Sequence, residues 1–346
     1  MRCFVTSAML LPAVLAVAAA HAQEDQIFGK KSGTPTRGTI TAISPAEVKI
    51  QSRGAPLTFD VKDILKVTFD GEPSELRTAR DRALAGQYED AVEELKKINA
   101  AEIGNSVIKQ DVGYYAAYCT ARLALTAGGD KTAAIGLLMD FFRQNPKSFH
   151  FFEGVELLGD LNFAAAKYED AANFYAVMLR DAPWPDYRMK ATVLQARAKS
   201  AEGKYPEAQS LFEQVLSSGL NTPEAVEQKM HATVGKAVCL SATGKADEGI
   251  AMIEDLIAKN DPTDATLFGR AYNAMGACYE KVGKTQDALF AYLHTDVLFF
   301  SDAEAHAEAL YHLSKLWTAV NRSDRATHDR ALLQSRYAGS RWAGMP

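Results

Sequence analysis

Residues 270–292 read RAYNAMGACYEKVGKTQDALFAY, and this stretch decides the fold. Two antiparallel helices can pack closely only if small side chains lie where they cross, and Gly276 and Ala288 provide such positions. Gly283 lies between them, where a tight connection needs a residue that tolerates a positive φ. Large apolar side chains recur three or four residues apart, which predicts two helices with an apolar stripe. These side chains are Tyr272, Met275, Tyr279 and Tyr292.

The combination of a turn residue and a small residue five positions later recurs along the chain. One pair of helices cannot bury its apolar stripe alone, so it needs neighbours of the same kind. Seven copies follow one another between residues 74 and 338, at intervals of 37 to 43 residues. The expected turn residues are Gly86, Gly129, Ala166, Gly203, Gly244, Gly283 and Asn321.

This pattern resembles the tetratricopeptide repeat (TPR), a helix-turn-helix unit of about 34 residues. The resemblance covers residues 74–338, although the fourth and fifth copies lack the Leu-Gly or Met-Gly pair that the third and sixth copies have. It implies a mostly α fold over residues 73–346, an α-α superhelix of about seven helix pairs. In this family, the first helix of each pair lines a concave groove that binds a segment of a partner protein.

Residues 36–72 follow a different period and predict a small β module. Apolar and polar residues alternate there in four short runs with turn residues between them. The module resembles a small barrel of the Sm-like or SH3-like type, and we expect it to lean on the first helix because its own core is small. Residues 23–35 are polar and contain Gly33 and Pro35, so we expect a flexible lead-in.

The first 22 residues are typical of a cleaved secretory signal peptide. Arg2 precedes a short apolar run, and Ala20 and Ala22 form a small-x-small cleavage site. An uncleaved membrane anchor is the alternative, but the run is short for a membrane span. We therefore expect an exported bacterial protein of the periplasm or cell envelope, with no membrane span once the signal is removed.

Charge and cysteine content exclude some classes of partner. The chain has 346 residues and a net charge of −5, which becomes −6 when Arg2 leaves with the signal peptide. A mildly acidic chain without a Lys/Arg run is a poor candidate for nucleic-acid binding. The three remaining cysteines, an odd and sparse set, argue against a disulfide framework.

The sequence predicts no catalytic residues, no cofactor and no metal, and hence a protein that is not an enzyme. It contains no HExxH, CxxC, GxSxG or P-loop motif. His306 and His312 are six residues apart and would not share a helical face. Cys239 and Cys278 both lie five residues before a turn glycine, and we expect them to be small buried apolar residues.

The resemblance to the TPR family also implies which side chains face the groove. In each repeat these are the residues thirteen, ten and six positions before the turn residue. We expect an acidic groove at repeat three and a more basic one at repeats four and six, an arrangement that could orient an extended peptide. The polar or aromatic candidates are Glu153, Glu156, Asp160, Lys190, Arg197, His231, Arg270, Asn273, Tyr311 and Lys315.

Two functions remain open at this point. The first is a non-catalytic scaffold with a protein or peptide partner, which predicts separated charge patches and no deep pocket. The alternative is a small-ligand or glycan-binding protein, or an enzyme accessory subunit, which predicts a closed apolar pocket with convergent polar groups. A homo-oligomer formed through the terminal repeats is also possible. We expect the aromatic clusters at 149–152 and 183–185 to pack between repeats rather than to bind a partner.

Overall fold

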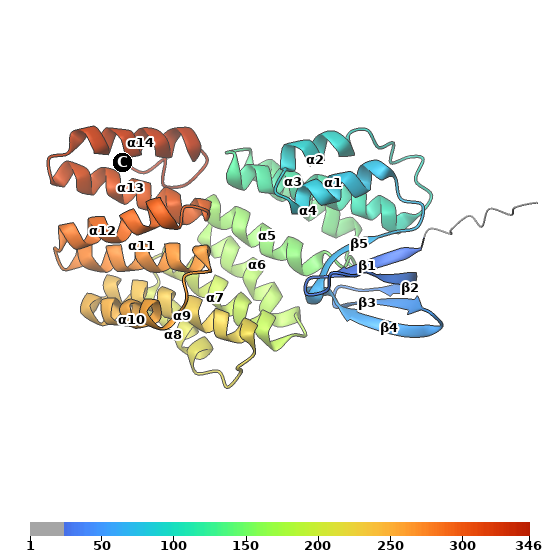
Figure 1. Ribbon diagram of the computed structural model, residues 1–346, viewed down its shortest axis with the longest axis horizontal. Helices are drawn as coiled ribbons and strands as arrows, with labels where there is room; N and C mark the ends of the chain where they lie inside the picture. The colour runs from blue at the N-terminus through green and yellow to red at the C-terminus, as the bar shows by residue number, and fades with distance from the viewer. Residues whose placement is uncertain (1–23) are drawn as a thin grey trace, which may run out of the picture.

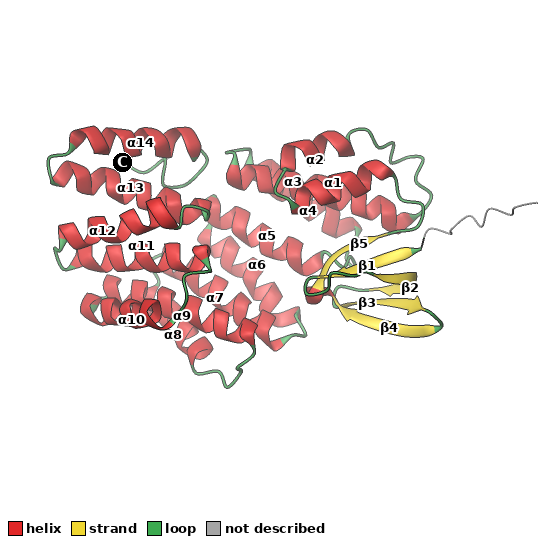
Figure 2. Cartoon of the chain, viewed as in Figure 1, coloured by secondary structure: helices red, strands yellow, loops and turns green. Residues whose placement is uncertain are grey.

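The computed structural model describes residues 24–346, so the expected signal peptide lies outside the described residues. Within this part, fourteen α-helices follow a small β-sheet (Figures 1 and 2). They form seven consecutive pairs, as the repeat pattern predicts, and together make a TPR-like superhelix. The helices are α1 (Ser74–Leu84), α2 (Tyr88–Leu95), α3 (Ser106–Thr126), α4 (Lys131–Gln144), α5 (Phe151–Ala164), α6 (Tyr168–Asp181), α7 (Pro185–Ala201), α8 (Tyr205–Leu216), α9 (Pro223–Ala242), α10 (Ala246–Lys259), α11 (Ala265–Lys281), α12 (Thr285–Leu298), α13 (Ala303–Ala319) and α14 (Ser323–Arg336).

The turn inside each helix pair contains one residue in the left-handed conformation. Six of the seven expected residues have it, including two that are not glycine, Ala166 with φ 58° and Asn321 with φ 59°. The exception is the second repeat, where Gly128, with φ 77°, takes the place that we expected for Gly129. In each turn the positive φ reverses the chain within a few residues, so the two helices lie side by side.

The expected close crossings within a pair are also present. A Cβ atom on Gly276 would lie 2.7 Å from the ring of Tyr292, and one on Gly159 would lie 2.3 Å from the ring of Tyr175. Both distances are far below van der Waals contact. The glycine of the first helix therefore accommodates the tyrosine ring of the second, and both tyrosines are buried.

The β module is a five-stranded antiparallel sheet in the order β4-β3-β2-β1-β5. Its first strand, β1, lies within the residues that we expected to be a flexible lead-in. Ile27 of β1 is buried, and the strand pairs with β2 on one side and with β5 on the other. The strands are β1 (Asp25–Gly29), β2 (Thr36–Ile43), β3 (Glu47–Ser52), β4 (Ala55–Asp60) and β5 (Ile64–Thr68).

The sheet shares its core with the first two repeats. Ile27, Ile50 and Val67 belong to the same buried cluster as Leu76 of α1 and Ile108 of α3. The sheet also reaches later repeats, because Ala46 and Val61 pack against Phe152 and Trp184. Lys62, in the short turn before β5, forms an ion pair of 2.9 Å with Asp186 of α7. The module is therefore fixed against both repeat one and repeat four.

The residues after α14 connect the last repeat to repeats two and three. Tyr337 and Trp342 are buried against α13. The Nζ atom of Lys131, at the start of α4, donates a hydrogen bond of 2.7 Å to the carbonyl oxygen of Gly339. Arg341 donates to the hydroxyl of Tyr168 on α6 at 3.1 Å. The segment that follows repeat seven is thus tied to repeats two and three.

Candidate functional site

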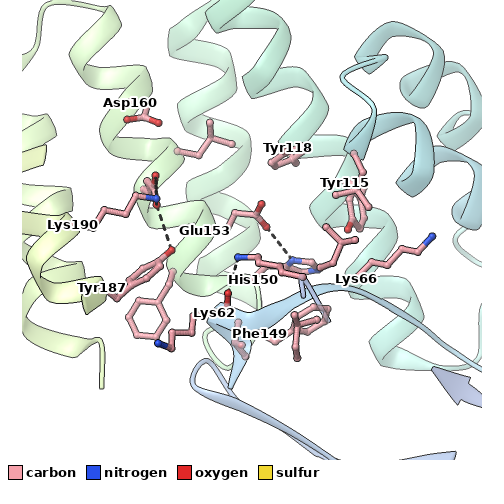
Figure 3. A pocket seen from close by; sticks show the side chains of 18 of the residues that line it. Lys62, Lys66, Tyr115, Tyr118, Phe149, His150, Glu153, Asp160, Tyr187 and Lys190 are labelled. Atoms are coloured by element: carbon pink, nitrogen blue, oxygen red, sulfur yellow. Dashed lines mark hydrogen bonds and ion pairs between the residues drawn. The ribbon is translucent and has the colours of Figure 1, made fainter. Parts of the chain in front are cut away.

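A cavity of about 250 Å³ lies between the β module and the first helices of repeats two, three and four (Figure 3). Helices α3, α5 and α7 form one wall, and the segment from residue 61 to residue 66 forms the opposite wall. Its lining is mixed in character, with aromatic rings beside carboxylates and amines. The polar and aromatic side chains that matter most for binding are Lys62, Tyr115, Tyr118, Arg122, His150, Glu153, Glu156, Asp160, Tyr187 and Lys190. We call it the first cavity.

A buried chain of charged groups supports one side of the first cavity. Arg80 of α1 donates to both carboxylate oxygens of Glu72, at 3.1 and 2.9 Å, and also donates to Asp111 of α3. The Nε2 atom of His150 lies 2.7 Å from the Oδ1 atom of Asp111. All four side chains are buried. Buried charges are stable only when they are paired in this way, so the chain fixes the imidazole of His150 in one orientation.

The pKa values of His150 and Asp111 depend on burial and on the groups that they contact. Burial alone would lower the pKa of His150, but hydrogen bonds to Asp111 and Glu153 outweigh it and raise that pKa. Burial alone would raise the pKa of Asp111, but the charge of Arg80 and the hydrogen bond from His150 lower it. Both shifts favour the charged forms, so the two groups form an ion pair.

Glu153 projects from α5 toward the first cavity, and two neighbours hold it. The hydroxyl of Tyr114 donates to it at 2.7 Å, and the Nδ1 atom of His150 lies 3.7 Å away. The rings of Tyr114 and His150 stack with centroids 3.6 Å apart. Because the Glu153 side chain is still 53% exposed, its carboxylate remains open to a ligand in the cavity.

The acidic and basic residues of repeats three and four pair with each other. Glu156 of α5 and Lys190 of α7 form an ion pair of 2.6 Å, and the hydroxyl of Tyr187 lies 3.4 Å from Glu156. Asp160, one turn further along α5, accepts a hydrogen bond of 2.8 Å from Tyr175. The groove therefore does not divide simply into an acidic repeat three and a basic repeat four, because its charges are partly neutralised across the repeat boundary.

A second cavity, of about 380 Å³, continues from the first toward the C-terminal repeats. Arg122 and Asp160 line both cavities, so the two are parts of one concave surface. Helices α3, α5, α7 and α11 contribute to the second cavity, and the residues after α14 form part of its wall. Neither cavity is the closed apolar pocket that a small-ligand site predicts, because charged side chains line both.

Six of the ten predicted groove residues line these cavities. They are Glu153, Glu156, Asp160, Lys190, Arg197 and Arg270. The other four lie elsewhere. Asn273 is buried between α11 and α13, where its side-chain amide donates to the carbonyl oxygen of Ala305 at 2.8 Å. Tyr311 packs against Trp342, and Lys315 donates to the Tyr311 hydroxyl.

His231, the remaining predicted residue, belongs to a group of possible metal ligands. Within residues 24–346, Glu227, His231 and Asp264 are the one set of three whose ligand atoms lie within 4.8 Å of one another. Burial and the positive charges of Arg270 and Arg197 lower the pKa of His231 to about 4, so its imidazole is neutral at pH 7. A neutral imidazole and two carboxylates could hold a divalent cation, but the nearby arginines oppose its charge.

The sequence pattern offers no candidate in repeat two, where it assigns the turn to Gly129 although Gly128 is the residue with a positive φ. Counting back thirteen, ten and six positions from Gly128 gives Tyr115, Tyr118 and Arg122, and all three line the first cavity. Counting from Gly129 moves the prediction by one residue, which is about 100° around a helix. The same count therefore reaches cavity-lining residues in repeats two, three and four, but not in repeats five and seven, where His231, Tyr311 and Lys315 lie outside both cavities.

Cys239 and Cys278 are buried, as the sequence predicts, and the aromatic clusters lie at repeat junctions. Cys119, Cys239 and Cys278 are free thiols and are buried. Burial raises the pKa of the Cys119 thiol to about 12, which makes it a poor nucleophile at neutral pH. Phe152 and Trp184 pack edge to face at the junction of repeats three and four, with centroids 5.4 Å apart, and also line the first cavity.

Comparison with known proteins supports the fold. No protein-family model matches the chain, and no curated protein matches its sequence. Among solved structures, a tetratricopeptide repeat protein from Parabacteroides merdae matches with a TM-score of 0.54 and 19% identity, over 76% of this chain and 92% of that one. A Rap protein complexed with competence and sporulation factor matches with a TM-score of 0.52 and 11% identity, over 78% and 76% of the two chains.

A third solved structure, NprR in complex with its cognate peptide NprX, matches with a TM-score of 0.51 and 14% identity, over 75% of this chain and 77% of that one. Identities this low establish the fold alone. No helix within residues 24–346 is both long and apolar enough to cross a membrane. The helical part of the chain is therefore similar to proteins of the tetratricopeptide-repeat type in its fold, a TPR-like superhelix of seven helix pairs.

Proposed function

We propose that this protein is a non-catalytic scaffold that holds a segment of a partner protein along its concave groove. One observation carries the proposal: the first helices of repeats two, three and four present two adjoining cavities that share Arg122 and Asp160. An extended segment can lie across both, with side chains in each cavity. Aromatic rings such as Tyr118 and Tyr187 offer contact area, and Glu153 offers an open carboxylate.

Two structures of similar fold support this reading, since both are complexes: a Rap protein with competence and sporulation factor, and NprR with a peptide. We further propose that the chain acts in the bacterial cell envelope after residues 1–22 are removed, because those residues have the pattern of an export signal. The sequence of the β module resembles that of a small Sm-like or SH3-like barrel. In this proposal the module packs against the helices and forms one wall of the first cavity.

Site-specific photocrosslinking tests the binding surface. A benzophenone amino acid replaces Glu153 in the groove in one variant, and Asn173, which is exposed on α6, in a matched control. After irradiation in envelope extract, mass spectrometry identifies the crosslinked peptides. We expect one partner segment to be attached repeatedly at position 153 and not at position 173. Equal labelling at both positions, or none at 153, would contradict a groove-binding scaffold.

A small ligand in the second cavity is the alternative function that the geometry favours next. The residues after α14 form part of the wall of that cavity, so an occupant there is more enclosed than in an open solenoid. Native mass spectrometry of the protein purified from its own host decides between the two. A stoichiometric small molecule that survives desalting would favour the alternative, and an apo mass would favour the scaffold.

A further inference from the structure

The carboxylates of the second cavity already have partners. Asp302 accepts from Arg270 at 2.9 Å and caps α13 through the amide of Ala305. Glu304 accepts from Arg341 at 2.9 Å. Asp160 accepts from Tyr175, as described above, and burial together with the charge of Glu156 raises the pKa of Asp160, which favours its neutral form. The acids of this cavity therefore have little capacity left for further cations.

The arginines of the same cavity have unused donors. Within residues 24–346, Arg197 forms no ion pair and no hydrogen bond; its guanidinium lies over the ring of Phe163, 5.4 Å from the centroid. Arg122 donates through Nε to the hydroxyl of Tyr118 at 3.1 Å, with no hydrogen bond from its two terminal nitrogens to the described residues. The Nε atom of Arg270 is buried and has no acceptor among them. A guanidinium donor that is shielded from water and has no acceptor is costly, so this surface is suited to an anion.

The ionisation of neighbouring groups agrees with an excess of positive charge. Burial and the charge of Arg270 lower the pKa of Arg197. The same two arginines contribute to the low pKa of His231. A negative group placed among Arg122, Arg197 and Arg270 would relieve this repulsion, whereas a cation would increase it.

We propose that Arg197, with Arg122 and Arg270, binds a carboxylate of the partner segment in the second cavity. The three residues come from α3, α7 and α11, that is, from repeats two, four and six, and they line one cavity. The planar guanidinium group of an arginine can bind a carboxylate through two parallel hydrogen bonds. A phosphate is disfavoured because Asp302 and Glu304 line the same cavity, and they would repel a dianion more than a monoanion. This inference rests on the proposed function for the source of the carboxylate.

The first test needs no partner. Acetate, and separately inorganic phosphate, is titrated into the ¹⁵N-labelled full chain while the Nε–Hε resonances of its arginines are followed by NMR. The Arg197 resonance is assigned by its loss in Arg197→Lys, and Arg143, which pairs with Asp140 on the surface of α4, is the internal control. We expect a saturable shift at Arg197 with acetate, at about tenfold lower concentration than with phosphate. A shift that stays linear and parallels Arg143 would overturn the inference.

The second test distinguishes the sources of the carboxylate. Synthetic peptides of the crosslinked partner segment are compared with a free or amidated C-terminus, and with each Glu or Asp changed to its amide. We expect one of these changes to weaken binding about tenfold or more, and Arg197→Gln to weaken it by a similar factor, while Arg143→Gln has no effect. If all of these peptides bind with equal affinity, both to the parent protein and to Arg197→Gln, the carboxylate inference is wrong and the scaffold proposal is retained. If acetate saturates Arg197 but no segment is captured, the scaffold fails and the anion site stands.

Discussion

The Nε2 atom of His150 lies 2.7 Å from the Oδ1 atom of Asp111, and the rest of that carboxylate contacts the buried guanidinium of Arg80. This relationship joins the loop before α5 to α3 and, through Arg80, to α1 and the edge of the β module. A carboxylate shared by two cations is a strong local constraint, because loss of either partner leaves a buried charge with one fewer hydrogen bond.

We expect His150→Phe to destabilise the fold in a pH-dependent manner. The ring still stacks on Tyr114, but its hydrogen bond to Asp111 is lost, which costs on the order of 1–3 kcal/mol. Because the folded-state pKa of His150 is raised, its contribution is fully present below the unfolded value of about 6.5 and is lost as pH rises through the folded value. The free energy of unfolding, measured in urea at about pH 5.5 and about pH 9, should therefore differ more between the two proteins at the lower pH.

The exposed His328 on α14 provides the control for this experiment. His328→Phe should change the free energy of unfolding by no more than about 0.5 kcal/mol, as is usual for surface substitutions. A His150→Phe deficit that is larger at the higher pH than at the lower one would show that the ring is buried in its neutral form.

Ala166→Gly should stabilise the protein. Ala166 ends its turn with φ 58°, a conformation that costs a residue with a side chain about 1–2 kcal/mol, part of which is offset by the greater unfolded-state entropy of glycine. We expect a net gain of up to about 1 kcal/mol in chemical denaturation. Ala165→Gly, one residue earlier at φ −86°, is the matched control and should lower stability.

Gly276→Ala should destabilise the sixth repeat, because the new methyl group would lie 2.7 Å from the ring of Tyr292. Overpacking of this kind costs about 1–3 kcal/mol. Gly136 lies in α4, and a methyl group added there would meet nothing within 4 Å beyond the adjacent backbone of its own helix, so Gly136→Ala should instead stabilise by about 0.5–1 kcal/mol. Thermal unfolding of both variants beside the parent checks the pair. Similar losses in the two would mean that the crossing at Gly276 is not close.

Trp342→Ala should loosen the connection between the last repeat and repeats two and three. The Trp342 ring is buried beside Tyr311, and its Nε1 atom donates to Glu304 at 3.1 Å. Loss of such a side chain costs about 3–5 kcal/mol where it cannot be compensated. Spin labels at Thr132 on α4 and Thr327 on α14, both exposed, should report a broader distance distribution in the variant. Trp317→Ala, on α13 and half-buried, is the control and should leave the distribution unchanged.

The helix pairs and four of the five strands were predictable because local rules govern them. A tight helix-helix turn needs a positive φ, and residues that accept one recur at a fixed interval. The strand β1 was not predicted because Ile27 is its one buried apolar side chain, so its sequence shows no alternation of apolar and polar residues. The tail that meets Lys131 could not be foreseen, since this contact joins residues 208 positions apart.

The candidate site was predictable in part for a related reason. Periodicity gives the inward face of a helix, and it identified Glu156 and Arg197 as cavity residues. Periodicity does not show which side chains of different helices pair. The ion pair of Glu156 with Lys190 and the buried charged groups from Glu72 to His150 were therefore not predicted. In sequence, a charge that is buried and paired has the same appearance as one exposed to solvent.

The hydrogen bond between Lys131 and Gly339 has a kinetic meaning for any long occupant of the groove. In an open solenoid the terminal repeats do not contact each other, so an extended segment can enter the groove from the side. Here the segment after repeat seven is tied to repeat two, so an occupant that extends past this contact would have to pass beneath it or wait for it to open. Association and dissociation of such a segment would then both require this contact to open. The lifetime of the complex would depend on the rate of opening rather than on the strength of the contacts within the groove.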